Sequence, residues 1–122
     1  LLEKWLLLFR GYESNWYWDW KAKRFMQEEY QNKTHFSHEW LLDEIKKLAP
    51  KTILEPGCGF GRTLTYLRNN YPASYSGIDI CKQFVEVARR EFPSSIYEGD
   101  IYRTIMPGFD LVFTHALLQH IS

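Results

Sequence analysis

Apolar and polar positions show two different periodicities in the second half of the chain, one typical of strands and one typical of helices. Residues 52–54 are β-branched or apolar throughout and predict a short buried strand. Residues 62–71 space their apolar side chains at helical intervals, at Leu64, Leu67 and Tyr71, and predict an amphipathic helix. A strand followed so closely by a helix is the usual beginning of a βαβ unit.

The same alternation continues to the end of the chain. Further strands are predicted at residues 75–80, 97–101 and 109–114. A helix follows the first of these and is closed by Pro93. Strands separated by helices of this length imply a parallel sheet with right-handed crossovers, and hence an α/β fold. The side chains predicted on the helix before Pro93 are Phe84, Val87, Ala88 and Glu91.

Residues 1–49 are predicted to form a helical cap in front of this unit. A first helix covers residues 1–10 and stops at Gly11, and a second lies within residues 12–30. A third covers residues 38–48, with Ser37 as its N-cap. Its predicted buried stripe consists of Leu41, Leu42, Ile45 and Leu48.

The second of these segments is rich in aromatic side chains, including Trp16, Trp18 and Trp20. Two interpretations remain open for them. They could form a lid over a ligand or a wall that binds a cationic group. Alternatively, they pack the N-terminal helices onto the sheet, as large side chains do in a short chain that has to build a core.

Composition and charge narrow the class of protein. A chain of 122 residues that is 45% hydrophobic and 17% aromatic is expected to fold as one compact domain. Fifteen basic and fifteen acidic residues cancel, so no global field favours nucleic acid or an anionic membrane, and neither is predicted as a partner. No run is long enough to span a bilayer. Cys58 and Cys81 are too few for a disulfide framework, which fits a reducing cytoplasm.

The loop between the first strand and its helix carries glycine at every second position, at Gly57, Gly59 and Gly61. Glycine lets the chain turn sharply and lets a ligand approach bare backbone. A dinucleotide fingerprint would read G-x-G-x-x-G, whereas this loop reads G-x-G-x-G with Glu55 two residues before it. A carboxylate there would repel a pyrophosphate and suits a ligand that carries an ammonium or sulfonium group.

With its acidic residue and G-x-G-x-G loop, the sequence resembles the class I S-adenosylmethionine-dependent methyltransferases. The resemblance covers roughly residues 50–122, through four motifs in register. It implies a Rossmann-like parallel sheet of strand order 3-2-1-4, with S-adenosylmethionine as cofactor. It also implies that Asp79 binds the ribose hydroxyls and that Asp100 faces the adenine amino group. The cofactor-binding residues expected in this way are Glu55, Gly57, Cys58, Gly59, Gly61, Asp79, Ile80, Asp100, Ile101 and Thr114.

Methyl transfer from a sulfonium needs no obligatory catalytic side chain, because the leaving group is already activated and the protein mainly orients the acceptor. A general base is needed only for an acceptor that must lose a proton. His115 and His120, just past the fourth strand, are candidates for that base; the alternative is that they pack or cap a helix. His35 and His38 have no nearby acids or cysteines, and no metal site is predicted.

Three functions remain open from the sequence. The first is an S-adenosylmethionine-dependent methyltransferase with an unidentified acceptor. The second is a cofactor-binding module that does not turn over by itself, because the chain stops after the fourth strand where the family continues with a fifth strand and an antiparallel pair. The third is part of a dinucleotide-binding oxidoreductase, disfavoured by Glu55. A fourth strand left at a sheet edge would also favour a homodimer through that edge.

Overall fold

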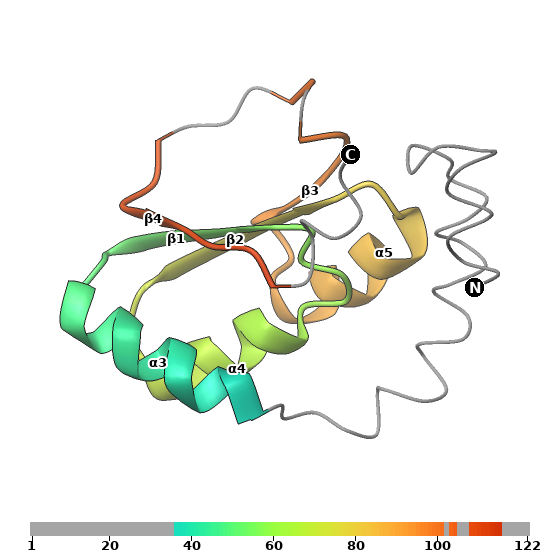
Figure 1. The fold of residues 1–122 in the computed structure, drawn as a ribbon. Coiled ribbons are helices and arrows are strands. Elements are labelled where there is room, and N and C mark those ends of the chain that lie inside the picture. The colour runs from blue at the N-terminus through green and yellow to red at the C-terminus, as the bar shows by residue number, and fades with distance from the viewer. Residues whose placement is uncertain (1–35, 102, 105–107, 116–122) are drawn as a thin grey trace, which may run out of the picture.

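The computed structural model of the protein describes residues 36–101, 103–104 and 108–115 (Figure 1). The predictions for the first two helices, the tryptophan-rich segment and His120 fall outside these residues. Seven elements follow one another along the described chain: α3 (Phe36–Leu48), β1 (Thr52–Pro56), α4 (Arg62–Asn70), β2 (Ser74–Asp79), α5 (Lys82–Glu91), β3 (Ile96–Glu98) and β4 (Leu111–Val112).

The four strands form one sheet in the order β3-β2-β1-β4, with every neighbouring pair parallel. This confirms the predicted strand order. Figure 1 shows α3, α4 and α5 beneath the same face of the sheet. Because all strands run in one direction, their carboxyl ends meet at a single edge, and that edge is where ligands bind in sheets of this kind.

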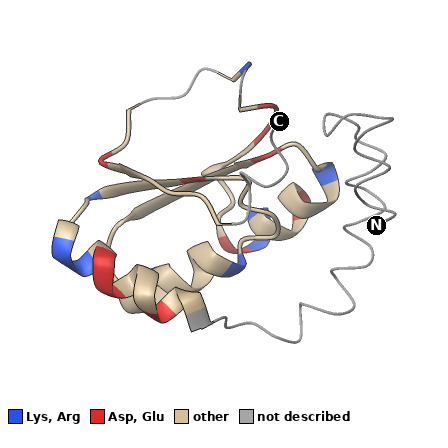
Figure 2. Ribbon diagram, in the orientation of Figure 1, with Lys and Arg blue, Asp and Glu red and all other residues tan. Residues whose placement is uncertain are grey.

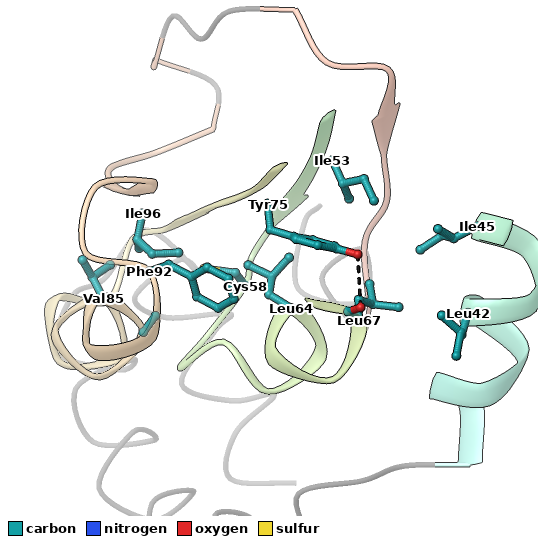
Figure 3. Close-up of a cluster of buried hydrophobic side chains, with 11 residues drawn as sticks. Leu42, Ile45, Ile53, Cys58, Leu64, Leu67, Tyr75, Val85, Phe92 and Ile96 are labelled. Carbon is teal, nitrogen blue, oxygen red and sulfur yellow. Dashed lines mark hydrogen bonds between the residues drawn. The ribbon is translucent and has the colours of Figure 1, made fainter. Parts of the chain in front are cut away.

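The core lies between that face of the sheet and the three helices (Figure 3). Ile53 of β1 and Leu64 and Leu67 of α4 are fully buried at its centre. Tyr75 of β2 is also buried, and its hydroxyl donates to the carbonyl oxygens of Leu67 (3.1 Å) and Tyr71 (2.7 Å). This core fixes α4, and therefore the loop that precedes it, against the sheet.

Helix α3 begins earlier than predicted. Its first residue is Phe36, so Ser37 lies inside the helix and is not its N-cap. The stripe prediction was also wrong at Leu48, which is 65% exposed. The fully buried position is instead His38, one turn before Leu42, because the helix axis directs positions 38, 42 and 45 at the core. On α5, all four predicted residues lie within the helix, and the buried side chains are those of Phe84, Val85 and Ala88.

The outer strands are shorter than predicted. Strand β3 is Ile96–Glu98 and β4 is Leu111–Val112. Side chains replace the ladder at the start of β4: the N–H of Asp110 donates to Thr52 Oγ1 (2.8 Å), and the N–H of Lys51 donates to Asp110 Oδ2 (2.9 Å). Beyond β4, the N–H of Phe113 still donates to the carbonyl oxygen of Leu54 (3.1 Å). The chain therefore keeps following β1 past the formal end of the strand.

Helices α3 and α5 carry charged side chains of both signs, whereas α4 carries only Arg62 and Arg68 (Figure 2). Helix α3 carries Glu39 in its first turn and Lys46 and Lys47 in its last, an arrangement that complements the helix dipole. Within the described residues, no helix has the length and apolar character needed to cross a membrane.

Candidate functional site

The glycine loop turns sharply at the carboxyl end of β1. Gly57, Gly59 and Gly61 all have positive φ angles, of 68°, 57° and 88°. The N–H groups of Gly57 and Cys58 both donate to the carbonyl oxygen of Ile78, at 2.7 and 3.2 Å. The loop is thereby fastened to the end of β2, and its left-handed residues explain why the sequence alternates glycine there.

Two of these glycines have different surroundings. A Cβ atom at Gly61 would lie 3.5 Å from Cβ of Ala88 on α5, an ordinary contact distance, so the positive φ angle and not crowding favours glycine at this position. A Cβ atom at Gly59 would have no atom of the described residues within 4 Å. Packing therefore does not account for Gly59, and the space over its backbone can admit a ligand.

Asp79 connects the end of β2 to this loop. Its Oδ2 accepts a hydrogen bond from the N–H of Gly59 (2.9 Å), and its Oδ1 accepts one from the N–H of Cys81 (2.8 Å). Burial raises the pKa of Asp79, and the N–H donors of Cys81, Gly59 and Ile80 oppose that shift. The N-cap of α5 is Cys81, so Asp79 does not occupy the cap position itself. A carboxylate has about four acceptor positions, so these three donors leave acceptor capacity for a further one.

Glu55 is a carboxyl group enclosed by the fold. It is 2% exposed, and its Oε1 is buried without a hydrogen-bond partner among the described residues. Burial raises the pKa of Glu55 well above its usual value, the charge of Asp79 raises it further, and Arg62 acts in the opposite direction. A buried carboxyl oxygen with an unmet acceptor capacity favours a donor that carries positive charge.

Cys58 lies in the same loop as a small buried side chain. It is unpaired, and burial raises the pKa of its thiol, as do the charges of Asp79 and Glu55. A thiol held neutral in this way is a poor nucleophile. The side chain of Cys58 instead packs in the core, against Gly77 of β2.

Asp100 and Ile101 follow β3 at the same edge of the sheet. The N–H of Gly99 donates to the carbonyl oxygen of Asp79 (3.0 Å), which holds the end of β3 beside the end of β2. The carbonyl oxygen of Asp100 accepts from the N–H groups of Arg103 (3.0 Å) and Thr104 (2.9 Å), so the residue begins a turn. Its side chain is 11% exposed and lies 3.8 Å from Nε of Arg103.

Most of the predicted residues therefore converge at one edge. The pairing of Glu55 with Gly77 and of Asp79 with Glu98 brings the ends of β1, β2 and β3 level. Ile80 is half-buried directly after β2. Thr114 is exposed and follows β4 on the other side of β1. His115 is half-buried, and a hydrogen bond of 2.9 Å joins its Nε2 to Oγ of Ser37.

Sequence reasoning missed Ser37, His38 and Thr63. A hydrogen bond of 3.0 Å joins Nε2 of His38 to Oγ1 of Thr63 on α4, and both residues are buried. The ring centroids of His38 and His115 are 5.7 Å apart. One signal was available: His38 precedes Leu42 by four positions and so continues the apolar stripe of α3.

Comparisons with known proteins agree on one class. A family model described as "Methyltransferase domain" matches residues 54–122. A trans-aconitate 2-methyltransferase from Afipia carboxidovorans is 29% identical over 104 residues, which are 83% of this chain and 40% of that protein. The chain thus spans about two fifths of the length of this relative.

Two solved structures have similar folds. A TehB-like S-adenosylmethionine-dependent methyltransferase from Corynebacterium glutamicum is 23% identical with a TM-score of 0.63, over 81% of this chain and 56% of that one. The amino pentose methyltransferase CalS10 from Micromonospora echinaspora, solved with S-adenosylmethionine bound, is 26% identical with a TM-score of 0.55. That match covers 66% of this chain and 36% of that one.

Proposed function

Because this chain belongs to the methyltransferase domain family, we propose that it is the cofactor-binding portion of an enzyme that transfers the methyl group of S-adenosylmethionine to an acceptor. Two observations carry the proposal: within the described part of the chain, the buried Oε1 of Glu55 has no hydrogen-bond partner, and the backbone of Gly59 is open. S-adenosylmethionine fits that pair of features, because it carries an ammonium and a sulfonium group and a narrow chain that can lie over glycine.

Each site residue has a role in this proposal. Glu55 attracts the cationic end of the cofactor. The glycine loop lies along its chain. Asp79, already oriented by the N–H groups of Gly59 and Cys81, accepts from the ribose hydroxyls with its remaining lone pairs. The adenine lies toward β3, near Ile80, Asp100 and Ile101, while Cys58 supports the loop by packing and Thr114 lies past β4.

The bound cofactor supplies an activated methyl group, and the chain's residues orient it and keep water away. His115 is the one described histidine at the end of β4, and it is the candidate base for an acceptor that must lose a proton. The acceptor is left open, since the two named relatives act on different ones, trans-aconitate and an amino pentose.

A cofactor-binding module that does not turn over by itself is the second candidate. It is favoured by the span of the chain, about two fifths of its curated relative. A cytoplasmic location is part of the proposal, because Cys58 and Cys81 are buried thiols that are not joined in a disulfide, as suits a reducing compartment.

Calorimetric titration with S-adenosylhomocysteine and, separately, with NAD tests the proposal. We expect binding of the first and none of the second, because a pyrophosphate would meet the carboxyl groups of Glu55 and Asp79. Asp79→Ala should weaken binding of S-adenosylhomocysteine by about 1.5–3 kcal/mol, the range for hydrogen bonds to charged groups. Asp43→Ala, at an exposed position of α3, is the matched control and should not change the affinity. Binding of NAD, or no binding of either ligand, would contradict the proposal.

A further inference from the structure

Helix α3 contacts two parts of the site edge through two adjacent residues. His38 makes the 3.0 Å hydrogen bond to Thr63, which is the second residue of α4 and lies two positions after Gly61. Ser37 makes the 2.9 Å hydrogen bond to His115, which follows β4. The two partners are 25 and 78 positions away along the chain. Two neighbouring residues of α3 thus connect the glycine-loop side of the site to the side at the end of β4.

This connection is enclosed by the fold. His38 is 0% exposed and Thr63 is 4% exposed. The imidazole of His38 also lies against two rings, with centroid distances of 5.2 Å to Tyr66 and 5.7 Å to His115. A buried imidazole that lost its hydrogen-bond partner would carry a desolvation penalty, so the bond to Thr63 holds the two helices in one relative position.

Helix α4 depends on such an external contact. Its N-cap is Gly61, which makes no side-chain capping bond. The three left-handed glycines before it have more conformational freedom than any other residue type. The start of α4 is therefore located by its neighbours: Ala88 of α5 beside Gly61, and His38 of α3 bonded to Thr63.

We propose that Ser37 and His38 are positioning residues of the site, His38 by holding the first turn of α4 behind the glycine loop and Ser37 by holding the imidazole of His115 at the end of β4. The inference rests on the proposed function, because the ligand whose site they position is S-adenosylmethionine. In the ligand-free protein the two bonds keep the loop and His115 in the arrangement that the ligand meets, so binding does not have to order them.

The test compares three variants of α4 in the 122-residue chain, titrated with S-adenosylhomocysteine. Thr63→Val keeps the shape of the side chain and removes the hydroxyl that His38 contacts; we expect affinity to fall about 5- to 10-fold, the equivalent of one buried hydrogen bond. Thr63→Ser restores the hydroxyl and should recover most of that loss. Thr65→Val makes the same chemical change on the same helix at a half-buried position and should stay within about twofold of the wild type.

Amide hydrogen exchange supplies a readout that a change in global stability does not imitate. Thr63→Val should speed exchange at Gly59 and Gly61 relative to Thr65→Val, because the loop loses its anchor. A lower melting temperature for Thr63→Val with unchanged affinity and loop exchange would overturn the proposal and leave His38 a purely structural residue. Equal losses in both valine variants would overturn it as well.

Ser37→Ala keeps the inference testable if Thr63→Val does not fold, since Ser37 is only partly buried. We expect it to weaken binding and to change the ring signals of His115 in nuclear magnetic resonance; affinity and ring signals equal to the wild type would overturn the role of Ser37. A wild-type chain that does not bind S-adenosylhomocysteine would instead refute the proposed function, so the two failures are distinguishable.

Discussion

The ionisation of one carboxyl group, that of Glu55, makes the stability of the ligand-free protein depend on pH. Burial and the neighbouring charge of Asp79 raise its pKa in the folded state, while the unfolded chain keeps a value near 4.5. A group of this kind stabilises the fold fully at pH values below its unfolded pKa. That contribution is lost as the pH rises through the raised folded pKa, because the buried carboxyl then has to ionise.

Glu55→Gln should therefore stabilise the ligand-free protein, and more at pH 8 than at pH 5. The amide keeps the size of the side chain and cannot ionise, so it avoids the buried charge that forms at higher pH. Urea unfolding of both proteins at the two pH values measures the difference. A difference that stays the same at both pH values would show that Glu55 does not titrate in this range.

Ligand binding should reverse the preference of the Glu55 carboxyl group for its neutral form. An ammonium group beside Glu55 favours the carboxylate, so binding of S-adenosylhomocysteine should release a proton in the wild type and none in Glu55→Gln. Calorimetry in two buffers of different ionisation enthalpy counts that proton. 5′-Methylthioadenosine, which lacks the ammonium group, is the matched ligand control and should release none.

At the scale of elements, β2 and the glycine loop touch at one point where only glycine fits. A Cβ atom at Gly77 would lie 2.6 Å from Sγ and 2.8 Å from Cβ of Cys58, and 3.1 Å from Cδ1 of Leu64. Gly77→Ala should therefore destabilise the protein by about 1–3 kcal/mol, the usual effect of overpacking a well-filled core. Chemical denaturation measures this change.

Gly108→Ala is the control for that substitution, because a Cβ atom there has no neighbour within 4 Å in the part of the chain that the structure describes. It should leave the free energy of unfolding within about 0.5 kcal/mol of the wild type. If Gly77→Ala is as stable as Gly108→Ala, the loop can move away from β2 more easily than the contact distances indicate.

The order of the elements could be predicted from the sequence, because alternating strands and helices with short connections permit few parallel topologies. Their boundaries could not, because these depend on contacts between distant segments. Strand β4 is short since Asp110 bonds with Thr52 and Lys51 outside the ladder, and no local pattern records that exchange. Leu48 was predicted to be buried on helical spacing alone, but α3 ends there with its core-facing side at Leu42 and Ile45.

Part of the candidate site could likewise be predicted from the sequence, and part of it could not. Glu55, the three glycines and Asp79 could be predicted because each follows its own strand directly, and parallel strands end at one edge. The contacts of His38 with Thr63 and of Ser37 with His115 could not, because they connect residues brought together only by packing of α3 against α4 and against the chain after β4. The position of a histidine in an apolar stripe indicates that the side chain is buried, but it does not indicate which side chain the histidine contacts.

At the scale of the whole molecule, the described helices lie on one face of a sheet whose β4 edge is paired on one side only. Within the described residues, β4 contacts β1 and has no strand on its other side. Val112 at this edge is 53% exposed, and residues 109–114 carry neither proline nor lysine, the residues that commonly protect sheet edges. The backbone groups on this side of β4 thus have no strand partner among the described residues.

We therefore predict that the 122-residue chain self-associates through this edge, as a two-fold dimer. Light scattering at micromolar concentration should give twice the 14.6 kDa of one chain. Val112→Lys places a charge on the exposed edge without disturbing the core, and it should shift the protein to the monomer. A monomer for both proteins, with rapid amide exchange at Leu111 and Phe113, would show that the edge remains unpaired in solution and that its short length is enough to prevent association.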